Sequence, residues 1–322
     1  MSDRYARQSV LPEVGPTGQA RLASATALVV GAGGLGCAVL QYLAAAGVGR
    51  LVIVDHDLVE ESNLHRQPLY RMSDLGAPKV EAARAALLAT NPGMRIEAVR
   101  ERLTAANAAR LVGMAEIAVD AADSFAVTYV LSDACGGTPL VSASVLGLSG
   151  YVGAFCGGAP SYRAVFPELP RTAGSCAETG VLGTAVGVMG TLEAHVALAL
   201  LLKWEPTVLG RLISIDFRTL RTGGFSFAGA SEPAGATLRF IAPSEVSERD
   251  IVIDLRSPLE APRSPFGSAL RVGVEALEKG EMRFPTEPRI VLCCRTGVRA
   301  WRAARALERQ GHANLALIAL GE

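Results

Sequence analysis

The chain has 322 residues, half of them apolar and 19% charged, which indicates a globular protein with enough residues for two domains. Thirty-one basic and thirty-one acidic residues cancel, so the excess charge typical of nucleic-acid or anionic-membrane binding is missing. The longest apolar run, residues 181–202, contains Glu193 and His195, so no membrane span is expected. The first residues lack a signal-peptide pattern, and we expect a cytoplasmic protein whose six cysteines are free thiols.

Strands and helices alternate along the first two thirds of the chain. Apolar residues 27–30 form an expected strand that ends in a glycine-rich loop, followed by a helix over 37–46 and a strand over 51–54. Further helices are expected at 79–89, 105–112, 124–135 and 192–203, and further strands at 95–99, 117–119, 140–142, 150–155, 163–166 and 211–220. This order predicts an α/β fold with a Rossmann-like, doubly wound and mainly parallel sheet.

The alternation stops at residues 222–237, which are rich in Gly, Ala and Ser, and it restarts after them. Strands are then expected at 251–254 and 290–292, and a helix at 298–309. We therefore expect a nucleotide-binding domain, a linker and a second, smaller α/β domain, over residues 1–225, 226–240 and 241–322.

Glycines follow the first strand in the pattern Gly31-x-Gly33-x-x-Gly36, with Gly34 among them, and this loop opens a helix. Such glycines let backbone N–H groups approach a phosphate at a helix N-terminus. Asp55 ends the second strand, where its carboxylate can accept hydrogen bonds from ribose hydroxyls. These residues predict a nucleotide site, and taken alone they favour NAD.

The residues around this loop form an ordered series of motifs. In chain order they are Arg4-Tyr5-Ala6-Arg7-Gln8, the glycine loop, Val54-Asp55-x-Asp57, Ser62-Asn63-Leu64-His65-Arg66-Gln67, Gly76-Ala77-Pro78-Lys79, Asp120-Ala121-Ala122-Asp123 and Ser175-Cys176-Ala177-Glu178. Over residues 4–222 this series resembles the MoeB/ThiF/HesA family, the bacterial relatives of ubiquitin-activating enzymes. The resemblance implies a homodimer that binds ATP and Mg²⁺. It also implies adenylation of the C-terminal glycine carboxylate of a ubiquitin-like sulfur carrier ending in Gly-Gly, followed by sulfur transfer to give a thiocarboxylate.

The chemistry and the resemblance assign roles to individual residues. Arg66 and Lys79 supply positive charge for the phosphates, and Asn63 acts beside them. Asp123 holds Mg²⁺ at the carboxyl edge of the sheet, and Arg7 enters the site of the opposite subunit. The nucleotide site is then expected to contain Gly31, Gly33, Gly34, Gly36, Asp55, Asp57, Asn63, Arg66, Lys79 and Asp123.

Two cysteines stand where sulfur chemistry is expected. Cys176 matches the family cysteine that links covalently to the activated carrier or relays sulfur to it. The segment Cys294-Arg295-Thr296-Gly297-Val298-Arg299-Ala300 follows a strand, precedes a helix and resembles the active loop of rhodanese domains. Backbone N–H groups in such a loop, together with Arg295 and Arg299, stabilise a thiolate or a persulfide. The function implied here includes a protein sulfur donor such as a cysteine desulfurase.

The chain departs from its relatives at several positions. Family members usually hold a structural zinc on two Cys-x-x-Cys pairs, and the four positions are occupied here by Ser161, Ala164, Phe225 and Ala228. Because these side chains offer no thiolate, we expect no zinc, with apolar packing by Phe225 and Phe227 in its place. Ser124 and Thr128 replace a usual Asn and Arg, and the rhodanese-like domain is expected to be shortened at its C-terminus.

Two other functions are compatible with the sequence. An NAD-dependent oxidoreductase would use the glycine loop but would give no role to Arg66, Lys79 or Cys294. A non-catalytic scaffold that binds a ubiquitin-like protein would explain Ser124 and Thr128. Exchange of pyrophosphate into ATP separates the adenylating enzyme from both.

Overall fold

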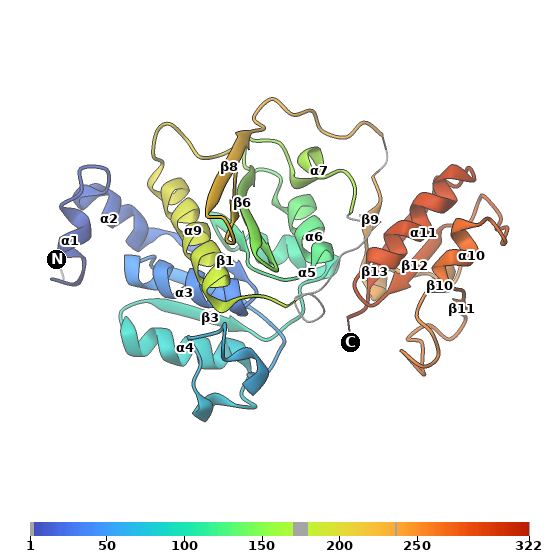
Figure 1. Ribbon diagram of the computed structural model, residues 1–322, viewed down its shortest axis with the longest axis horizontal. Coiled ribbons are helices and arrows are strands. Elements are labelled where there is room, and N and C mark those ends of the chain that lie inside the picture. The colour runs from blue at the N-terminus through green and yellow to red at the C-terminus, as the bar shows by residue number, and fades with distance from the viewer. Residues whose placement is uncertain (1–2, 170–179, 236, 322) are drawn as a thin grey trace.

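The computed structural model describes residues 3–169, 180–235 and 237–321, and these contain two β-sheets (Figure 1). The larger sheet has eight strands in the order β3-β2-β1-β4-β5-β6-β7-β8. They are β1 (Thr26–Val30), β2 (Arg50–Val54), β3 (Arg95–Val99), β4 (Ile117–Asp120), β5 (Pro139–Leu146), β6 (Ser149–Cys156), β7 (Arg211–Asp216) and β8 (Arg221–Ser226). The smaller sheet has five strands in the order β11-β10-β12-β13-β9. They are β9 (Arg239–Phe240), β10 (Ile251–Asp254), β11 (Leu270–Arg271), β12 (Ile290–Cys294) and β13 (Leu315–Ala319).

Strands β3, β2, β1, β4 and β5 run parallel. Their side chains alternate between two cores, because successive residues of a strand point to opposite faces. Ala27 and Val29 share one core with α3 (Gly34–Ala46), α4 (Lys79–Thr90) and α9 (Gly183–Leu202). Leu28 and Val30 share the other core with α5 (Ala105–Val112) and α6 (Phe125–Cys135). The predicted doubly wound α/β fold, with a second and smaller α/β unit, is confirmed.

Strands β6, β7 and β8 extend this sheet in the antiparallel direction. The sequence predicted one strand over residues 211–220 and irregular chain from residue 222, and both predictions were wrong. The Asp216 carboxylate accepts hydrogen bonds from the backbone N–H groups of Arg218 (2.9 Å) and Thr219 (3.2 Å). These bonds fix a chain reversal after β7, so the glycine-rich residues that follow return as strand β8.

The strand expected over residues 163–166 is instead the short helix α7 (Tyr162–Val165). The Ser161 hydroxyl caps this helix by accepting a hydrogen bond from the backbone N–H of Ala164 at 3.3 Å. Tyr162 is buried, with its ring edge-on to those of Tyr129 (5.4 Å) and Phe155 (5.2 Å). Aromatic residues that suggested a strand therefore anchor one helical turn in the core.

Helix α9 is long and apolar enough to cross a membrane by length and composition alone. It packs on α3, β5 and β6, and about 61% of its apolar stretch is buried inside the fold. Its apolar character is therefore explained by its place in the core of the larger unit. The prediction placed this helix at 192–203, and helix α2 (Gly15–Ser24) at the start of the chain was not predicted.

The strands of the smaller sheet are all parallel, with α10 (Val274–Glu278) and α11 (Val298–Arg309) beside them. Asp254 at the end of β10 is fully buried, and the Arg256 guanidinium donates to both of its oxygens at 3.0 and 2.9 Å. This ion pair compensates the buried charge at the end of β10, and backbone pairing places that end beside β12, the strand that carries Cys294.

Three aromatic side chains connect the two units. Tyr129 of α6 lies 5.2 Å from Trp301 of α11 and 6.4 Å from Phe240 of β9, between ring centroids. Each of the three is no more than 5% exposed. We call Tyr129, Phe240 and Trp301 the aromatic joint. Because of it, the core around α5 and α6 continues into the smaller unit, and α11 lies beside the larger one (Figure 1).

Candidate functional site

The glycine loop between β1 and α3 has the geometry of a phosphate site. Gly31 has a φ of 96°, and a Cβ atom there would lie 2.7 Å from the backbone oxygen of Ala121. A Cβ atom on Gly36 would lie 2.0 Å from the backbone oxygen of Gly31. Only glycine fits either position, so the loop turns tightly. Gly33 caps α3 and Gly34 begins it, which leaves the helix N-terminus facing the carboxyl edge of the sheet.

Asp55 connects the end of β2 to this loop. Its Oδ2 accepts a hydrogen bond from the backbone N–H of Ala32 at 2.7 Å, and its Oδ1 accepts from that of Asp57 at 2.8 Å. The Tyr70 hydroxyl donates to the Ala32 carbonyl at 2.6 Å, so the loop is held from both sides. Each oxygen of Asp55 has a second lone pair, which suits a ribose hydroxyl.

Lys79 begins α4, and its buried side chain donates from Nζ to Oδ2 of the half-exposed Asp57 at 2.9 Å. Burial acts to raise the pKa of Asp57, but the hydrogen bond and charge of Lys79 outweigh it, and the pKa is lowered. Ligand atoms of Asp55, His56 and Asp57 lie within 4.8 Å of one another. The carboxylates of Asp55 and Asp57, however, already accept the hydrogen bonds described above.

Arg66 and Asn63 lie in the segment that follows β2. The Arg66 guanidinium donates to Oδ1 of Asn63 at 2.5 Å, and the Asn63 amide donates to Glu60 at 3.1 Å. A Cβ atom on Gly34 would lie 3.6 Å from Cγ of Arg66. The fold therefore brings this planar cation to the start of α3, next to the glycine loop.

Gln67 was part of a motif but was not predicted as a site residue. Its side chain is 2% exposed, and Oε1 has no hydrogen-bond partner among the residues that the structure describes. Its amide nitrogen lies 3.7 Å from the position of a Cβ atom on Gly33. A buried carboxamide oxygen without a donor costs free energy, so Gln67 is a candidate ligand contact beside the glycine loop.

Two aspartates at the end of β4 have opposite surroundings. Asp120 is fully buried, and burial raises its pKa to about 6, although the Ser142 hydroxyl donates to it at 3.0 Å. Asp123 is exposed in the bend between β4 and α6. An exposed carboxylate at the carboxyl edge of a parallel sheet suits a hard cation such as Mg²⁺.

Glu193 of α9 is a third carboxyl group in this region, and it was not predicted as a functional residue. It is fully buried, and neither oxygen has a hydrogen bond of normal geometry among the described residues. Burial, with the charge of Asp120, raises its pKa well above the usual value, and the Ala143 backbone offsets only part of this. Burial therefore favours the protonated, uncharged form of this group.

Arg7 lies far from the glycine loop of its own chain. It is exposed on α1 (Ala6–Ser9), and the next residue, Gln8, donates to the carbonyl of Ala46 at 3.0 Å. Ala46 is the last residue of α3, and the glycine loop is at the other end of this 13-residue helix, which spans about 20 Å. Within one chain, Arg7 and the loop therefore stand at opposite ends of α3.

Cys294 ends β12, and its sulfur accepts hydrogen bonds from backbone donors. The N–H groups of Gly297 and Ala300 lie 3.1 and 3.4 Å from Sγ. Gly297, with a φ of 88°, caps α11, so the helix N-terminus faces the sulfur. Arg299 in the first turn of α11 forms an ion pair with Glu260. The cysteine residue itself has no exposed surface.

The remaining cysteines that the structure describes differ from Cys294. Cys293 points into the core on the opposite face of the smaller sheet, and burial raises its pKa to about 12. Burial likewise raises the pKa of Cys37 to about 12 and that of Cys156 to about 11, and it raises that of Cys135. These thiols are buried apolar residues. Cys176 lies outside the described residues.

Different contacts occur near the four positions that carry zinc ligands in the family. The Ser161 hydroxyl and backbone N–H donate to Glu232 at 2.6 and 2.7 Å. Of the two phenylalanines expected to pack there, Phe227 is 5% exposed and stacks on Phe155 at 4.9 Å. Phe225 is 53% exposed, so only one of the pair is a core residue.

The larger unit thus has a glycine loop fixed by Asp55 with cations beside it, and the smaller unit has backbone N–H groups directed at the Cys294 sulfur. The ThiF family model matches residues 5–234, and the chain belongs to the ThiF family.

Similar proteins agree with this assignment. The chain is 44% identical over 218 residues to the SAMP-activating enzyme E1 of Haloferax volcanii, covering 66% of this chain and 81% of that protein. It is 47% identical over 228 residues to the adenylyltransferase and sulfurtransferase MOCS3 of Bos taurus, covering 68% of this chain but only 50% of that protein. It is 33% identical to the probable adenylyltransferase/sulfurtransferase MoeZ of Mycobacterium tuberculosis over 349 residues, covering 96% of this chain and 88% of that protein.

A solved structure of Escherichia coli MccB with MccA-N7isoASN has the same fold, with a TM-score of 0.63 at 21% identity over 74% of this chain and 75% of that one. The family and the enzyme class predicted from the sequence, an adenylyltransferase/sulfurtransferase, are confirmed by the relatives. The match to MoeZ extends over both units.

Proposed function

We propose that this chain uses ATP to adenylate the C-terminal glycine carboxylate of a ubiquitin-like sulfur carrier ending in Gly-Gly, and then adds sulfur to give a thiocarboxylate. The observation that carries the proposal is the presence of two chemistries in one ThiF-family chain. These are the glycine loop held by Asp55 and the backbone donors around the Cys294 sulfur. An NAD-dependent oxidoreductase would use only the first of them.

The phosphates of ATP bind at the N-terminus of α3, and Asp55 accepts hydrogen bonds from the ribose. Gly31 and Gly36 fit this role because neither position has room for a side chain, which leaves the backbone N–H groups accessible. The exposed carboxylate of Asp123 has the hard oxygen ligands that Mg²⁺ prefers. When bound, Mg²⁺ neutralises charge on the phosphates.

In the adenylation step, an oxygen of the carrier carboxylate attacks the α-phosphorus, and the bond to pyrophosphate breaks. Negative charge spreads over the phosphoryl oxygens, so fixed cations lower the barrier. Arg66 supplies a planar guanidinium group with several N–H donors, and Lys79 supplies a compact positive charge. Asn63 orients Arg66 by accepting a hydrogen bond from its guanidinium group. The half-exposed Asp57 is released from Lys79 when a phosphate oxygen takes its place.

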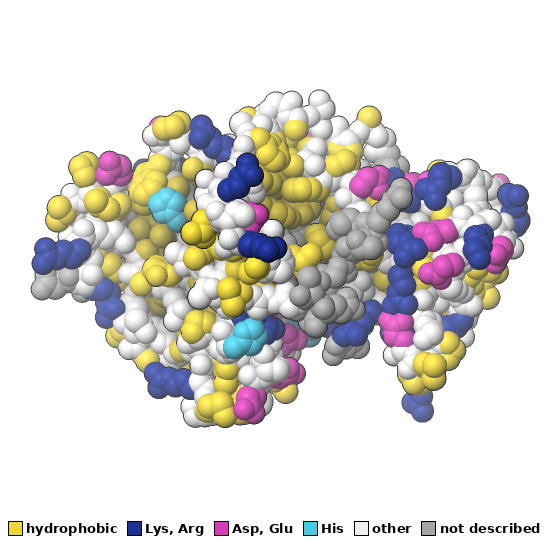
Figure 2. Space-filling view, in the orientation of Figure 1, with side chains coloured by type: hydrophobic (Ala, Val, Ile, Leu, Met, Phe, Trp, Pro, Cys, Tyr) yellow, Lys and Arg dark blue, Asp and Glu magenta, His cyan; other side chains and the backbone are white. Residues whose placement is uncertain are grey.

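The active form in this proposal is a homodimer in which Arg7 completes the site of the partner subunit. The position of Arg7 at the far end of α3 supports this role. An apolar groove of about 360 Å³ between α9 and strands β6 to β8, lined by Val196, Ile213 and the exposed Phe225, supports a protein interface there. Apolar side chains gather over these strands in Figure 2.

Sulfur transfer in this proposal uses two thiols. Cys176 couples to the activated carrier, and Cys294, near Arg299, carries a persulfide taken from a protein donor such as a cysteine desulfurase. Residues 1–225 carry out adenylation and residues 241–322 handle sulfur, joined by residues 226–240. We further propose that the protein is cytoplasmic and contains no zinc.

Exchange of labelled pyrophosphate into ATP, with Mg²⁺ and a carrier ending in Gly-Gly, tests the proposal directly. Exchange that depends on the carrier and stops when its last glycine is removed supports adenylation. Carrier binding without exchange would instead establish a scaffold, and reduction of NAD by a small substrate would establish an oxidoreductase.

A further inference from the structure

Cys294 has no exposed surface, although a thiol that takes sulfur from another protein must be reached from solvent. In loading, the Cys294 thiolate attacks the outer sulfur of a donor persulfide. A new S–S bond forms, the S–S bond of the donor breaks, and the donor leaves as a thiolate, so no separate oxidant or reductant is needed. The attack requires space in line with the S–S bond that breaks. What covers Cys294 therefore determines when it can be loaded.

The loop that carries Cys294 packs against the larger unit. A Cβ atom on Gly297 would lie 2.6 Å from the ring of Phe240 and 3.5 Å from Cβ of Ala126 in α6. Gly297 is also the residue whose N–H donates to the Cys294 sulfur at 3.1 Å. Gly297 therefore touches both the thiol and the surface of α6.

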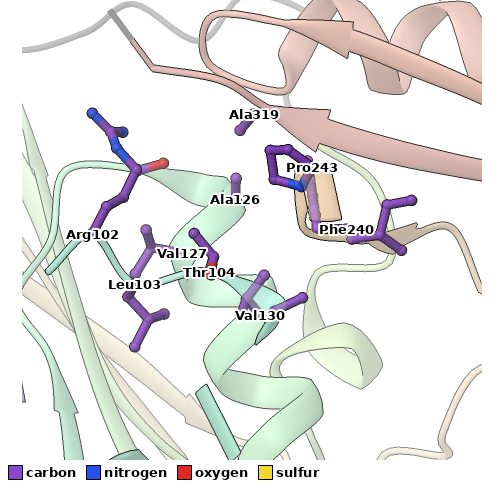
Figure 3. Close-up of a pocket in the computed structure, with 12 residues that line it drawn as sticks. Arg102, Leu103, Thr104, Ala126, Val127, Val130, Phe240, Pro243 and Ala319 are labelled. Atoms are coloured by element: carbon purple, nitrogen blue, oxygen red, sulfur yellow. The ribbon is translucent and has the colours of Figure 1, made fainter. Parts of the chain in front are cut away.

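A cavity of only about 40 Å³ remains between the units at this contact. In Figure 3, Ala126 points from α6 toward the part of the smaller unit that carries Pro243 and Ala319, with Phe240 beside them. A space of this size holds only a few water molecules. A donor protein therefore cannot approach along this face while the units are in contact.

Further contacts keep the units together. The aromatic joint lies next to Gly297 and brings Tyr129 of α6 against Phe240 and Trp301 of the smaller unit. The Trp301 indole donates to Glu168 of the larger unit at 3.1 Å, and Arg305 pairs with the same carboxylate at 2.6 Å. Trp301 and Arg305 both belong to α11, the helix that begins at the Cys294 loop.

We propose that docking of the smaller unit against α6 closes the Cys294 site, and that sulfur is loaded only when the aromatic joint opens. This inference rests on the proposed role of Cys294 as the sulfur carrier. The chain between the two sheets allows the movement, because residues 227–235, 237 and 238 lie in neither sheet. Nine of these residues in extended form reach about 30 Å, enough to expose the loop while the units stay connected.

The test is the rate at which iodoacetamide alkylates Cys294 in the folded 322-residue chain, mapped by peptide mass spectrometry. Ala126→Arg places a long charged side chain into the contact without changing the smaller unit. We expect Cys294 to react at least tenfold faster in this variant. Ala109→Arg is the matched control, because it makes the same change at an exposed position of the neighbouring helix α5 and should leave the rate unchanged.

Cys37 and Cys135, both buried in the larger unit, serve as internal reporters and should stay unreactive. If they react in Ala126→Arg, the variant has unfolded, and Glu168→Arg then decides, because it opposes Arg305 with a like charge at an exposed position. Unchanged alkylation of Cys294 in a folded variant overturns the proposal and shows that the smaller unit buries its own cysteine. Faster alkylation without sulfur uptake from a persulfide donor would instead contradict the proposed function and leave the closure intact.

Discussion

The ammonium group of Lys79 lies 2.9 Å from Oδ2 of Asp57, and the lysine side chain is buried whereas the aspartate side chain is half-exposed. The surrounding structure therefore fixes the position of the cation before any ligand binds. Asp57, the counter-ion of Lys79, is accessible to solvent. A phosphate oxygen can therefore replace the Asp57 carboxylate next to the Lys79 ammonium group. A cation preorganised in this way stabilises a charged transition state without the cost of reorientation.

We expect Lys79→Ala to slow pyrophosphate exchange by roughly 10²- to 10³-fold, the usual loss when one stabilising group is removed from a transition state. The free energy of unfolding should fall by only about 1 kcal/mol, because the Asp57 left behind is half in water. Urea unfolding checks this second point. Arg84→Ala removes an exposed cation from the same helix and should keep full activity. Equal losses in both variants would indicate a structural effect on α4.

Asp123→Ala should abolish Mg²⁺-dependent exchange, because the metal loses its protein ligand, and Arg7→Ala should abolish it as well. Mixing the two inactive variants should restore part of the activity, since a hybrid dimer contains one complete composite site. The measurement is exchange activity after the subunits have been shown to mix by native mass spectrometry. Mixed hybrids without activity would show that Arg7 does not act across the interface.

Glu193→Gln should stabilise the protein at high pH. Burial raises the pKa of Glu193 well above its usual value and that of Asp120 to about 6. The folded state therefore binds more protons than the unfolded chain, and stability falls as pH rises through 4 to 6 and above. Replacing the acid by a neutral amide should raise the free energy of unfolding more at pH 8 than at pH 5, by up to about 1.4 kcal/mol for each unit by which folding raises the pKa of Glu193. Glu248→Gln, at an exposed position, is the control, and a gain of equal size at both pH values would disprove the assignment.

The two cysteines assigned to sulfur transfer should be separable. Adenylation needs no thiol, so Cys176→Ala and Cys294→Ala should both retain pyrophosphate exchange. Cys294→Ala should lose thiocarboxylate formation from a persulfide donor but recover it with free sulfide, whereas Cys176→Ala should be slow with either source. Intact-mass analysis after loading provides the direct test. An added sulfur on Cys293, whose pKa burial raises to about 12, would mean that the wrong residue of the loop was assigned.

Purified protein should contain no stoichiometric zinc, because the four expected ligand positions include Ser161 and Phe225 and offer no thiolate. Elemental analysis of protein prepared without chelators is the measurement. One tightly held zinc per chain would contradict the prediction. Such a zinc would need ligands from elsewhere, because in this region Ser161 donates to Glu232 and Phe227 stacks on Phe155.

Local signals predicted the parts of the fold that depend on nearby residues. The apolar run before Gly31 and the alternation after it defined β1, α3 and β2, and the bounds of β3, α5, β10 and α11 matched the predictions. The β7–β8 reversal was missed because it depends on hydrogen bonds from one side chain, Asp216, to the backbone beyond it. Helix α7 was missed for the same reason, since a single cap at Ser161 outweighs a strand-like composition.

The site residues also fall into those that local sequence signals predict and those that depend on packing. Gly31, Gly36 and Asp55 could be predicted as nucleotide contacts because their spacing along the chain is typical of such a loop, and the structure brings the three together. Glu193 was seen only as an interruption in an apolar run, since its burial depends on how α9 packs on β5. The aromatic joint could not be predicted at all, because it brings Tyr129 and Trp301 together only after both units have folded.

The short connection between the sheets has a kinetic consequence. When the joint opens, the smaller unit stays within about 30 Å of α6, and a tether of this length corresponds to an effective concentration on the order of millimolar. A sulfur donor present at micromolar concentration would therefore compete with α6 for the Cys294 loop. The effective concentration of the tethered α6 surface would be about a thousand times that of the donor. The affinity of the joint, rather than the reactivity of the thiol, would then set the fraction of time in which sulfur can enter the enzyme.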